Sequence, residues 1–249
     1  TIVEVSCDDM DNAKSIYGGG KGATVKGNST VTVTVPNATS SRWSLETISG
    51  SGTNADGSAL ADNVTGTKDV SIAMKDAGST GILQLMNLTG FDNLTLGDAN
   101  ANKFNYSVFK VSGRFDSKAT GPADTTDVRT GKVIVDDSSL ILNGNYQGHI
   151  GSMEVNGISS LSIHKEAKNN TRPLLVDKTV TLKTDQKLKI SAILANESTN
   201  NEAGDIILTF KDAANAKADS YVDANAELGV GKAETNILFK DPNAHTVES

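Results

Sequence analysis

The chain has 249 residues and a formal net charge of −7 at pH 7, with 37% hydrophobic and only 4% aromatic residues. The apolar share is large enough for a core, and the scarcity of rings favours a core of small branched side chains over a deep ligand pocket. The acidic balance argues against nucleic acid as a partner, because neutralising phosphates needs clustered Lys and Arg.

Cysteine usage and hydropathy narrow the class of protein further. Cys7 is the single cysteine and cannot form an internal disulfide, which excludes a small disulfide-stapled scaffold. No apolar run is long enough to cross a bilayer, and no hydrophobic leader stands at the start. Since the chain begins at Thr1 rather than at Met, we expect a mature or excised piece of an exported protein.

Segments in which apolar and polar residues alternate dominate the sequence, and each predicts a β-strand. The first clear one, residues 29–35 (STVTVTV), carries β-branched residues on both faces. Further predicted strands follow at 70–74, 81–86, 93–96, 104–111, 132–135, 139–142, 160–163, 174–182, 187–194 and 205–210. The connections are rich in Asn, Asp, Gly, Ser and Thr, which favour turns.

Two all-β architectures accommodate many short strands with frequent turns: an antiparallel β-sandwich or barrel, and a parallel β-solenoid. Hairpin dipeptides are too few to join all the strands in antiparallel fashion. They occur at Asn143-Gly144, Asn156-Gly157 and Asp56-Gly57. A loose strand theme recurs over residues 139–210 with spacers of unequal length, which a solenoid tolerates as loops.

We therefore predict a parallel β-helix that forms one elongated domain over residues 1–249, with the antiparallel β-sandwich as the alternative. Coils of roughly 20–25 residues, the length usual in repeat architectures, would give about ten turns. Residues 212–230 fit neither a strand nor a helix period cleanly. They are expected to form a loop excursion or a cap that protects strand edges near one end.

Residues 16–35, IYGGGKGATVKGNSTVTVTV, carry the most specific pattern. A Tyr and several glycines lead through a Val-x-Gly-Asn turn into an alternating strand. This pattern resembles one that recurs in large surface proteins of Gram-positive and gut bacteria, whose parallel β-helix domains are described as pectate-lyase-like adhesive domains. The resemblance, which continues diffusely over residues 81–210, implies a right-handed β-helix displayed on a bacterial surface as an adhesive module or structural stalk.

Parallel β-helices also house polysaccharide lyases and hydrolases, so an enzyme acting on acidic glycans is the alternative function. Such enzymes need paired carboxylates, or calcium-binding Asp residues beside a basic group. The acidic clusters of this sequence are Asp8, Asp9 and Asp11, then Asp124 and Asp127, and then Asp136 and Asp137. None predicts a catalytic pair, no convergent set of acidic and basic residues is visible, and His149, His164 and His245 lack metal-site spacing. We predict a non-catalytic protein without metal or cofactor.

Aromatic residues supply the candidates for a ligand-binding face. Trp43 is the single tryptophan and is flanked by Arg42 and Glu46, while Tyr106 lies in an aromatic-rich predicted strand with Phe109 on its other face. The alternative is that these rings fill the core or stack between coils. We predict Trp43, Arg42 and Tyr106 as binding residues of a monomeric, extracellular module, with a host glycan, a matrix protein or another cell as partner.

Overall fold

A computed structural model describes a large part of the chain. The described residues are 1–6, 13–35, 42–74, 82–97, 107–120, 128–144, 146, 148–156, 158–167, 170–171, 174–178, 180–182, 187–194, 206–210, 238–240 and 246–247. Residues 212–230 lie outside this set, so the predicted cap there stays a prediction, as does the extent of the domain over the whole chain.

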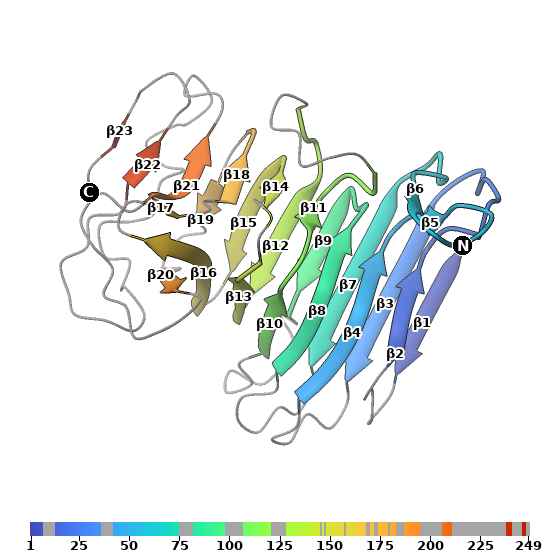
Figure 1. The fold of residues 1–249 in the computed structure, drawn as a ribbon, viewed down its shortest axis with the longest axis horizontal. Coiled ribbons are helices and arrows are strands. Elements are labelled where there is room, and N and C mark those ends of the chain that lie inside the picture. Colours follow the sequence, from blue (N-terminus) through green and yellow to red (C-terminus); the bar gives the residue numbers. More distant parts are fainter. Residues whose placement is uncertain are drawn as a thin grey trace.

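Two large sheets run side by side along the long axis of the molecule (Figure 1). Sheet A is seven-stranded and contains, in spatial order, β1 (Ile2–Ser6), β3 (Ser29–Val35), β7 (Lys68–Met74), β9 (Asn93–Leu96), β12 (Lys132–Asp136), β15 (Ser152–Asn156) and β19 (Val180–Leu182). The main row of sheet B contains β2 (Ala13–Tyr17), β4 (Arg42–Ser49), β8 (Ile82–Thr89), β10 (Ser107–Val111), β13 (Ser138–Leu142), β16 (Ile158–Ala167) and β20 (Lys187–Leu194).

Sheet B forks at β8, because the two halves of this strand pair with different neighbours. Leu83 pairs with Phe109 of β10, whereas Leu88 pairs with Phe115 of β11. The branch that starts there continues through β11 (Phe115–Asp116), β14 (His149–Ile150), β18 (Leu174–Val176), β21 (Ile206–Phe210) and β22 (Leu238–Lys240). Each later coil therefore presents a third, short face beside the two main ones.

Strands of successive coils pair in parallel throughout both large sheets of the described chain. Antiparallel pairs there involve short peripheral strands: β5 (Gly52–Thr53) with β6 (Leu60–Ala61), β17 (Asn170–Thr171) with β16, and β23 (Thr246–Val247) with β22. The chain winds in a right-handed sense from the N-terminal to the C-terminal end (Figure 1). The predicted right-handed parallel β-helix is confirmed, and the alternative antiparallel sandwich is wrong.

The coils are less uniform than the predicted 20–25 residues, and some are much longer. In sheet A, Lys132 pairs with Ser152, 20 residues further on, whereas Ser29 pairs with Lys68, 39 residues further on. The long coils carry extra loops between their strands, which the strand pattern alone does not reveal. The single strand predicted over 174–182 is also wrong, because the chain turns between β18 and β19.

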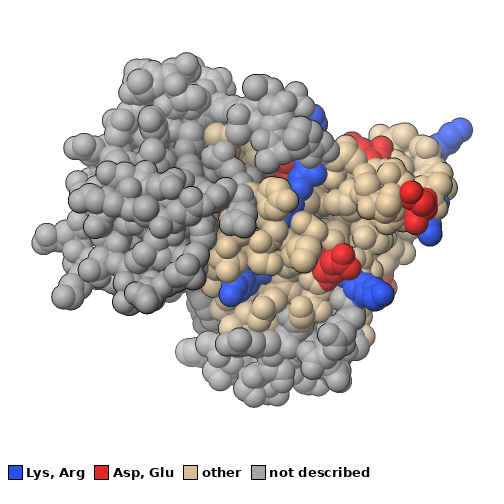
Figure 2. Space-filling model, viewed as in Figure 1, with Lys and Arg blue, Asp and Glu red and all other residues tan. Residues whose placement is uncertain are grey.

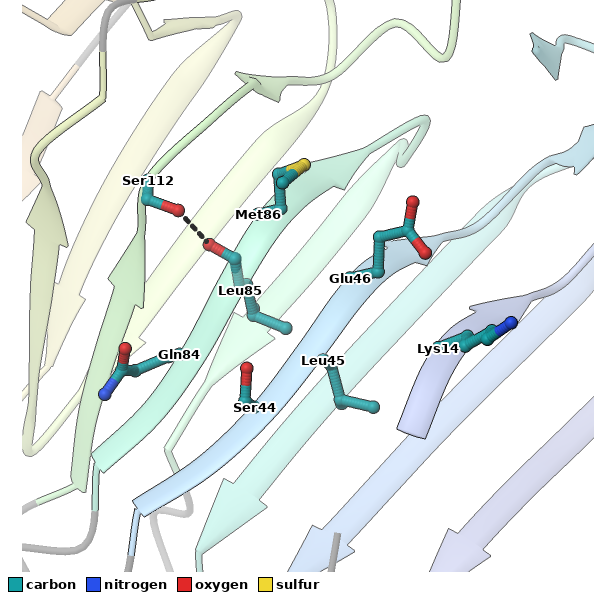
Figure 3. Close-up of a pocket in the computed structure, with 8 residues that line it drawn as sticks. All are labelled: Lys14, Ser44, Leu45, Glu46, Gln84, Leu85, Met86 and Ser112. Atoms are coloured by element: carbon teal, nitrogen blue, oxygen red, sulfur yellow. Dashed lines mark hydrogen bonds between the residues drawn. The ribbon is translucent and has the colours of Figure 1, made fainter. Parts of the chain in front are cut away.

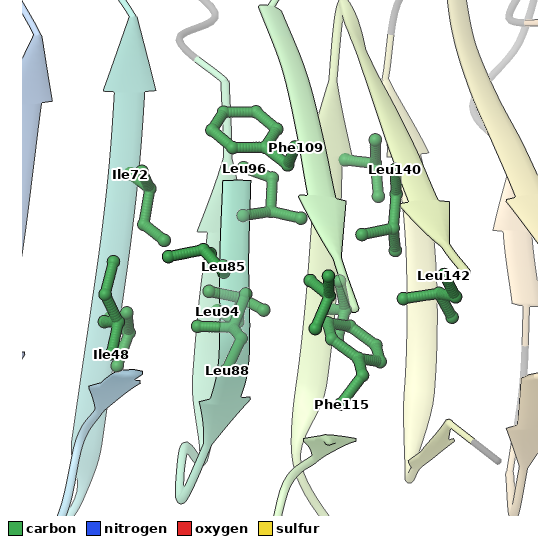
Figure 4. Close-up of a cluster of buried hydrophobic side chains, with 14 of the residues drawn as sticks. Ile48, Ile72, Leu85, Leu88, Leu94, Leu96, Phe109, Phe115, Leu140 and Leu142 are labelled. Carbon is green, nitrogen blue, oxygen red and sulfur yellow. The ribbon is translucent and has the colours of Figure 1, made fainter. Parts of the chain in front are cut away.

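The core consists of apolar side chains stacked in rows from coil to coil. One row from sheet A contains Val31, Val70, Leu94, Val133 and Met153, which occupy matching register positions and are at most 2% exposed. Facing rows of sheet B include Phe109 and Leu140, and Figure 4 shows their side chains meeting those of sheet A between the sheets. Small branched side chains fit this layer because neighbouring coils are only about 4.8 Å apart.

Gly97 provides a sharp test of this close stacking. It adopts a φ of +96°, and a Cβ added there would lie 2.0 Å from the Asp136 carbonyl oxygen of the next coil. Gly27 also has a positive φ, +116°, but faces open space. We expect Gly27→Ala to cost about 1–2 kcal/mol of backbone strain in the free energy of unfolding. Gly97→Ala should cost at least about 1 kcal/mol more, because relieving the clash distorts backbone geometry. If urea unfolding gave the two variants equal losses of unfolding free energy, the close approach of the two coils would be contradicted.

Candidate functional site

A shallow, open depression of about 420 Å³ lies on the outer face of sheet B (Figure 3). It spans β2, β4 and β8 and reaches the end of β10. The side chains that give it its chemistry are Lys14, Ser44, Glu46, Gln84, Met86 and Ser112. They come from β2, β4, β8 and the residue that follows β10, so the depression crosses the strands and follows the long axis of the molecule.

The alternation of side chains along the strands explains why these residues line the surface. Leu45 and Leu85 are buried register partners on β4 and β8, so their chain neighbours face outward. Ser44 lies opposite Gln84 in the same register. The polar rows of adjacent coils thus form one continuous outer surface above the aliphatic rows of the core.

The depression offers an ammonium, a carboxylate, an amide and a thioether to a ligand. Among the residues drawn in Figure 3, the one hydrogen bond runs from the Ser112 hydroxyl to the Leu85 carbonyl oxygen, at 3.2 Å. No hydrogen bond or ion pair within the described chain uses the polar groups of Lys14, Glu46 or Gln84. Met86 adds apolar surface, with 52% of the residue exposed. These groups are available to a ligand.

A second polar feature, a charged cluster centred on Asp116 of β11, lies inside the protein. The Arg129 guanidinium donates from Nε to Asp116 Oδ1 at 2.7 Å and from Nη2 to Oδ2 at 3.1 Å. Arg114 Nη2 donates to Oδ2 at 3.0 Å, and the Lys118 backbone N–H donates to Oδ1 at 2.9 Å. The Asp116 carboxylate thus accepts four hydrogen bonds, three of them from guanidinium groups, which is the arrangement that a buried charge requires.

Asp177, directly after β18, extends the cluster into the next coils. Its Oδ2 accepts a hydrogen bond from the Arg129 backbone N–H and lies 2.8 Å from Nε2 of His149 on β14. The short distance indicates the tautomer that carries a proton on Nε2. Through these contacts the segment that returns to β12 is fixed against three successive coils.

The centre of this cluster is buried and is not presented at the described surface. Asp116 and Arg129 are each 2% exposed, and His149 is 3% exposed. These residues meet only because the fold brings distant parts of the chain together: Arg129 is 13 positions from Asp116 and 48 from Asp177. No convergent acidic and basic set is visible in the sequence, and the cluster is therefore a structural element that the sequence did not predict.

The predicted binding residues lie at the margin of what the structure describes. Trp43 and Arg42 belong to β4, where the backbone register pairs them with Leu83 and Ile82. Their side chains and all of Tyr106 lie outside the described residues, so their role stays a prediction. Glu46, which the sequence analysis noted only as a neighbour of Trp43, lines the depression.

Charges on the face shown in Figure 2 are mixed rather than grouped by sign. Figure 2 shows acidic and basic side chains close to one another on the visible face, without a basic stripe. Within the described part of the chain, no group of three or more His, Cys, Asp or Glu residues is arranged to hold a metal ion. The acidic trio Asp8, Asp9 and Asp11 lies outside it. The described part also holds no helix with the length and hydrophobicity needed to cross a membrane.

The pKa of Asp56, which lies in the turn between β5 and β6, is lowered. The Ser58 hydroxyl donates to its carboxylate at 2.6 Å and the Ser58 backbone N–H at 2.8 Å, and both bonds stabilise the charged form. A lowered pKa means that this turn is stabilised above the ordinary pKa of 3.8, and that the stabilisation is lost as the pH falls through the lowered value. We expect Ser58→Ala to raise the pKa of Asp56, as measured by NMR titration of its carboxyl carbon. An unchanged pKa would show that the hydroxyl does not stabilise the carboxylate.

Comparisons with known proteins give no identification. No protein-family model matches the sequence, and neither the curated proteins nor the solved structures contain a match.

Proposed function

We propose that this chain is a section of an exported bacterial surface protein and serves as a non-catalytic adhesive module, with a structural stalk as the simpler form of the same role. The observation that carries the proposal is the open depression on the lateral face of the solenoid, where the polar groups of Lys14, Glu46 and Gln84, on three successive strands, make no hydrogen bond or ion pair within the described chain. The resemblance of residues 16–35 to pectate-lyase-like adhesive domains supports the same role.

The packing of the coils also supports a non-catalytic role. The space between the sheets is filled by stacked aliphatic and aromatic side chains, and Asp116, Arg129 and His149 in the charged cluster are buried. Glycoside hydrolysis needs two accessible carboxyl groups at a defined separation. A ligand would instead lie against the outer surface, where loops and sheet rows on a rigid scaffold commonly provide contacts.

Binding to a glycan array and to intact cells tests the adhesive role. We expect saturable binding that the double variant Glu46→Ala/Gln84→Ala weakens at least about tenfold, since each lost hydrogen-bonding group costs about 0.5–1.5 kcal/mol or more if charged. Thr32→Ala, on the outer face of sheet A, is the matched control and should leave binding unchanged. Trp43→Ala and Arg42→Ala test the two predicted residues on β4 in the same assay.

Two results would count against this function. Steady release of unsaturated product from pectin, alginate or hyaluronan, followed by ultraviolet absorbance, would replace the adhesive role with that of a lyase. Complete absence of binding to glycans, matrix proteins and cells would leave only the structural stalk.

A further inference from the structure

The charge balance of the depression separates the classes of glycan that it could accept. The residues that line the depression contribute one charge of each sign, from Lys14 and Glu46, and Lys110 lies beside Gln84 in the register of β8 and β10 on the same outward face. The whole chain carries a net charge of −7, which repels a polyanion approaching its surface. A neutral ligand avoids this repulsion, and its hydroxyl groups can donate charge-assisted hydrogen bonds to the Glu46 carboxylate.

Gln84 and Met86 add a more specific preference among neutral glycans. The Gln84 amide combines a hydrogen-bond donor and an acceptor on one planar group. Met86 lies two residues further along β8, on the same outward face, and offers a flexible thioether that contacts small apolar groups well. An acetamido group has the complementary set: a carbonyl oxygen, an N–H and a methyl.

The direction of the depression favours a linear ligand. Its lining passes from Lys14 on β2 to Ser112 after β10, across neighbouring parallel strands (Figure 3). Four strands at about 4.8 Å spacing give a contact length on the order of 14 Å along the molecule. An extended oligosaccharide lying parallel to the long axis would contact every coil that lines the depression.

We propose that the depression binds a linear, uncharged glycan that contains N-acetylated amino sugars, with the acetamido group at Gln84 and Met86 and ring hydroxyls at Glu46 and Ser44. This inference rests on the adhesive role proposed above and names the ligand class of that same surface.

Titration of the isotope-labelled chain by NMR tests the proposal with two matched probes. The tetramer of β-1,4-linked N-acetylglucosamine carries the acetamido groups, and the tetramer of β-1,4-linked glucose has hydroxyls in their place. We expect shifts of the Gln84 side-chain amide and of neighbouring residues, and a Kd at least about fivefold lower for the N-acetylated tetramer, the effect of one or two hydrogen bonds. Gln84→Leu should remove this preference, so that the two tetramers bind with similar Kd, and Thr32→Ala should change neither Kd.

The outcomes distinguish this inference from the function on which it rests. Equal affinity for the two tetramers, tighter binding of a hyaluronan oligosaccharide, or shifts confined to another surface would overturn the ligand class while leaving an adhesive role intact. Failure of every glycan, matrix protein and cell type to bind would overturn the adhesive role itself.

Discussion

Replacing Asp116 with Asn should lower the free energy of unfolding by about 3–5 kcal/mol, because a buried ion pair that loses one partner leaves an uncompensated charge. The substitution keeps the shape of the side chain, so packing hardly changes. The side chain of its partner Arg129 is only 1% exposed, so water cannot hydrate the guanidinium in place of Asp116. Urea unfolding followed by circular dichroism at pH 7 measures the difference.

The pair Lys132 and Glu154 on sheet A provides the matched control for a surface charge. The Lys132 side chain is 40% exposed, and its ion pair with Glu154 is solvated. Lys132→Ala should therefore cost less than about 1 kcal/mol. If Asp116→Asn lowered the free energy of unfolding by as little as Lys132→Ala, the buried cluster would not hold the coils together.

Truncating Phe109 to Ala should cost about 3–5 kcal/mol of unfolding free energy. Phe109 is 0% exposed and stacks between Leu83 and Leu140 of the adjacent coils, so the truncation leaves a cavity that neighbouring strands at fixed spacing cannot close. The adjacent residue Lys110 projects from the other face of β10, and Lys110→Ala should stay within about 0.5 kcal/mol of the natural chain. Similar losses for both variants would contradict the assignment of the two faces.

Much of the strand pattern and the parallel architecture were predictable from the sequence, because strand formation depends on local alternation, but β1, β2, β4 and β15 were not among the predicted strands. Residues 29–35 and 93–96 form β3 and β9 as predicted, and the predicted 132–135 lies within β12. The fold follows from stacking such segments at variable spacing. The coil lengths were not predictable, because the loops that separate Ser29 from Lys68 carry no signal of where the next coil begins.

The charged cluster and the depression could not be predicted, for a different reason. Asp177 was placed inside a strand, yet it lies in the bend directly after β18 and joins a cluster whose members are distant in sequence. The depression likewise depends on which outward rows become neighbours: Ser44 and Gln84 are paired by the register of β4 and β8, not by any shared motif. The predicted binding residues Trp43 and Arg42 are close in sequence to this surface, because their neighbour Glu46 lines it.

The stacking of coils, on which the lateral binding surface depends, is tested most directly by distances between spin labels on the outer face of sheet A. One register row there contains Glu4, Thr32, Ser71, Thr95, Ile134 and Glu154. Labels at positions 4 and 154, in a chain with Cys7→Ser, should lie about 24 Å apart, five strand spacings of about 4.8 Å. Moving the first label to position 32 should shorten the distance by about one spacing. Distances that do not decrease in this way would contradict the parallel stack of coils.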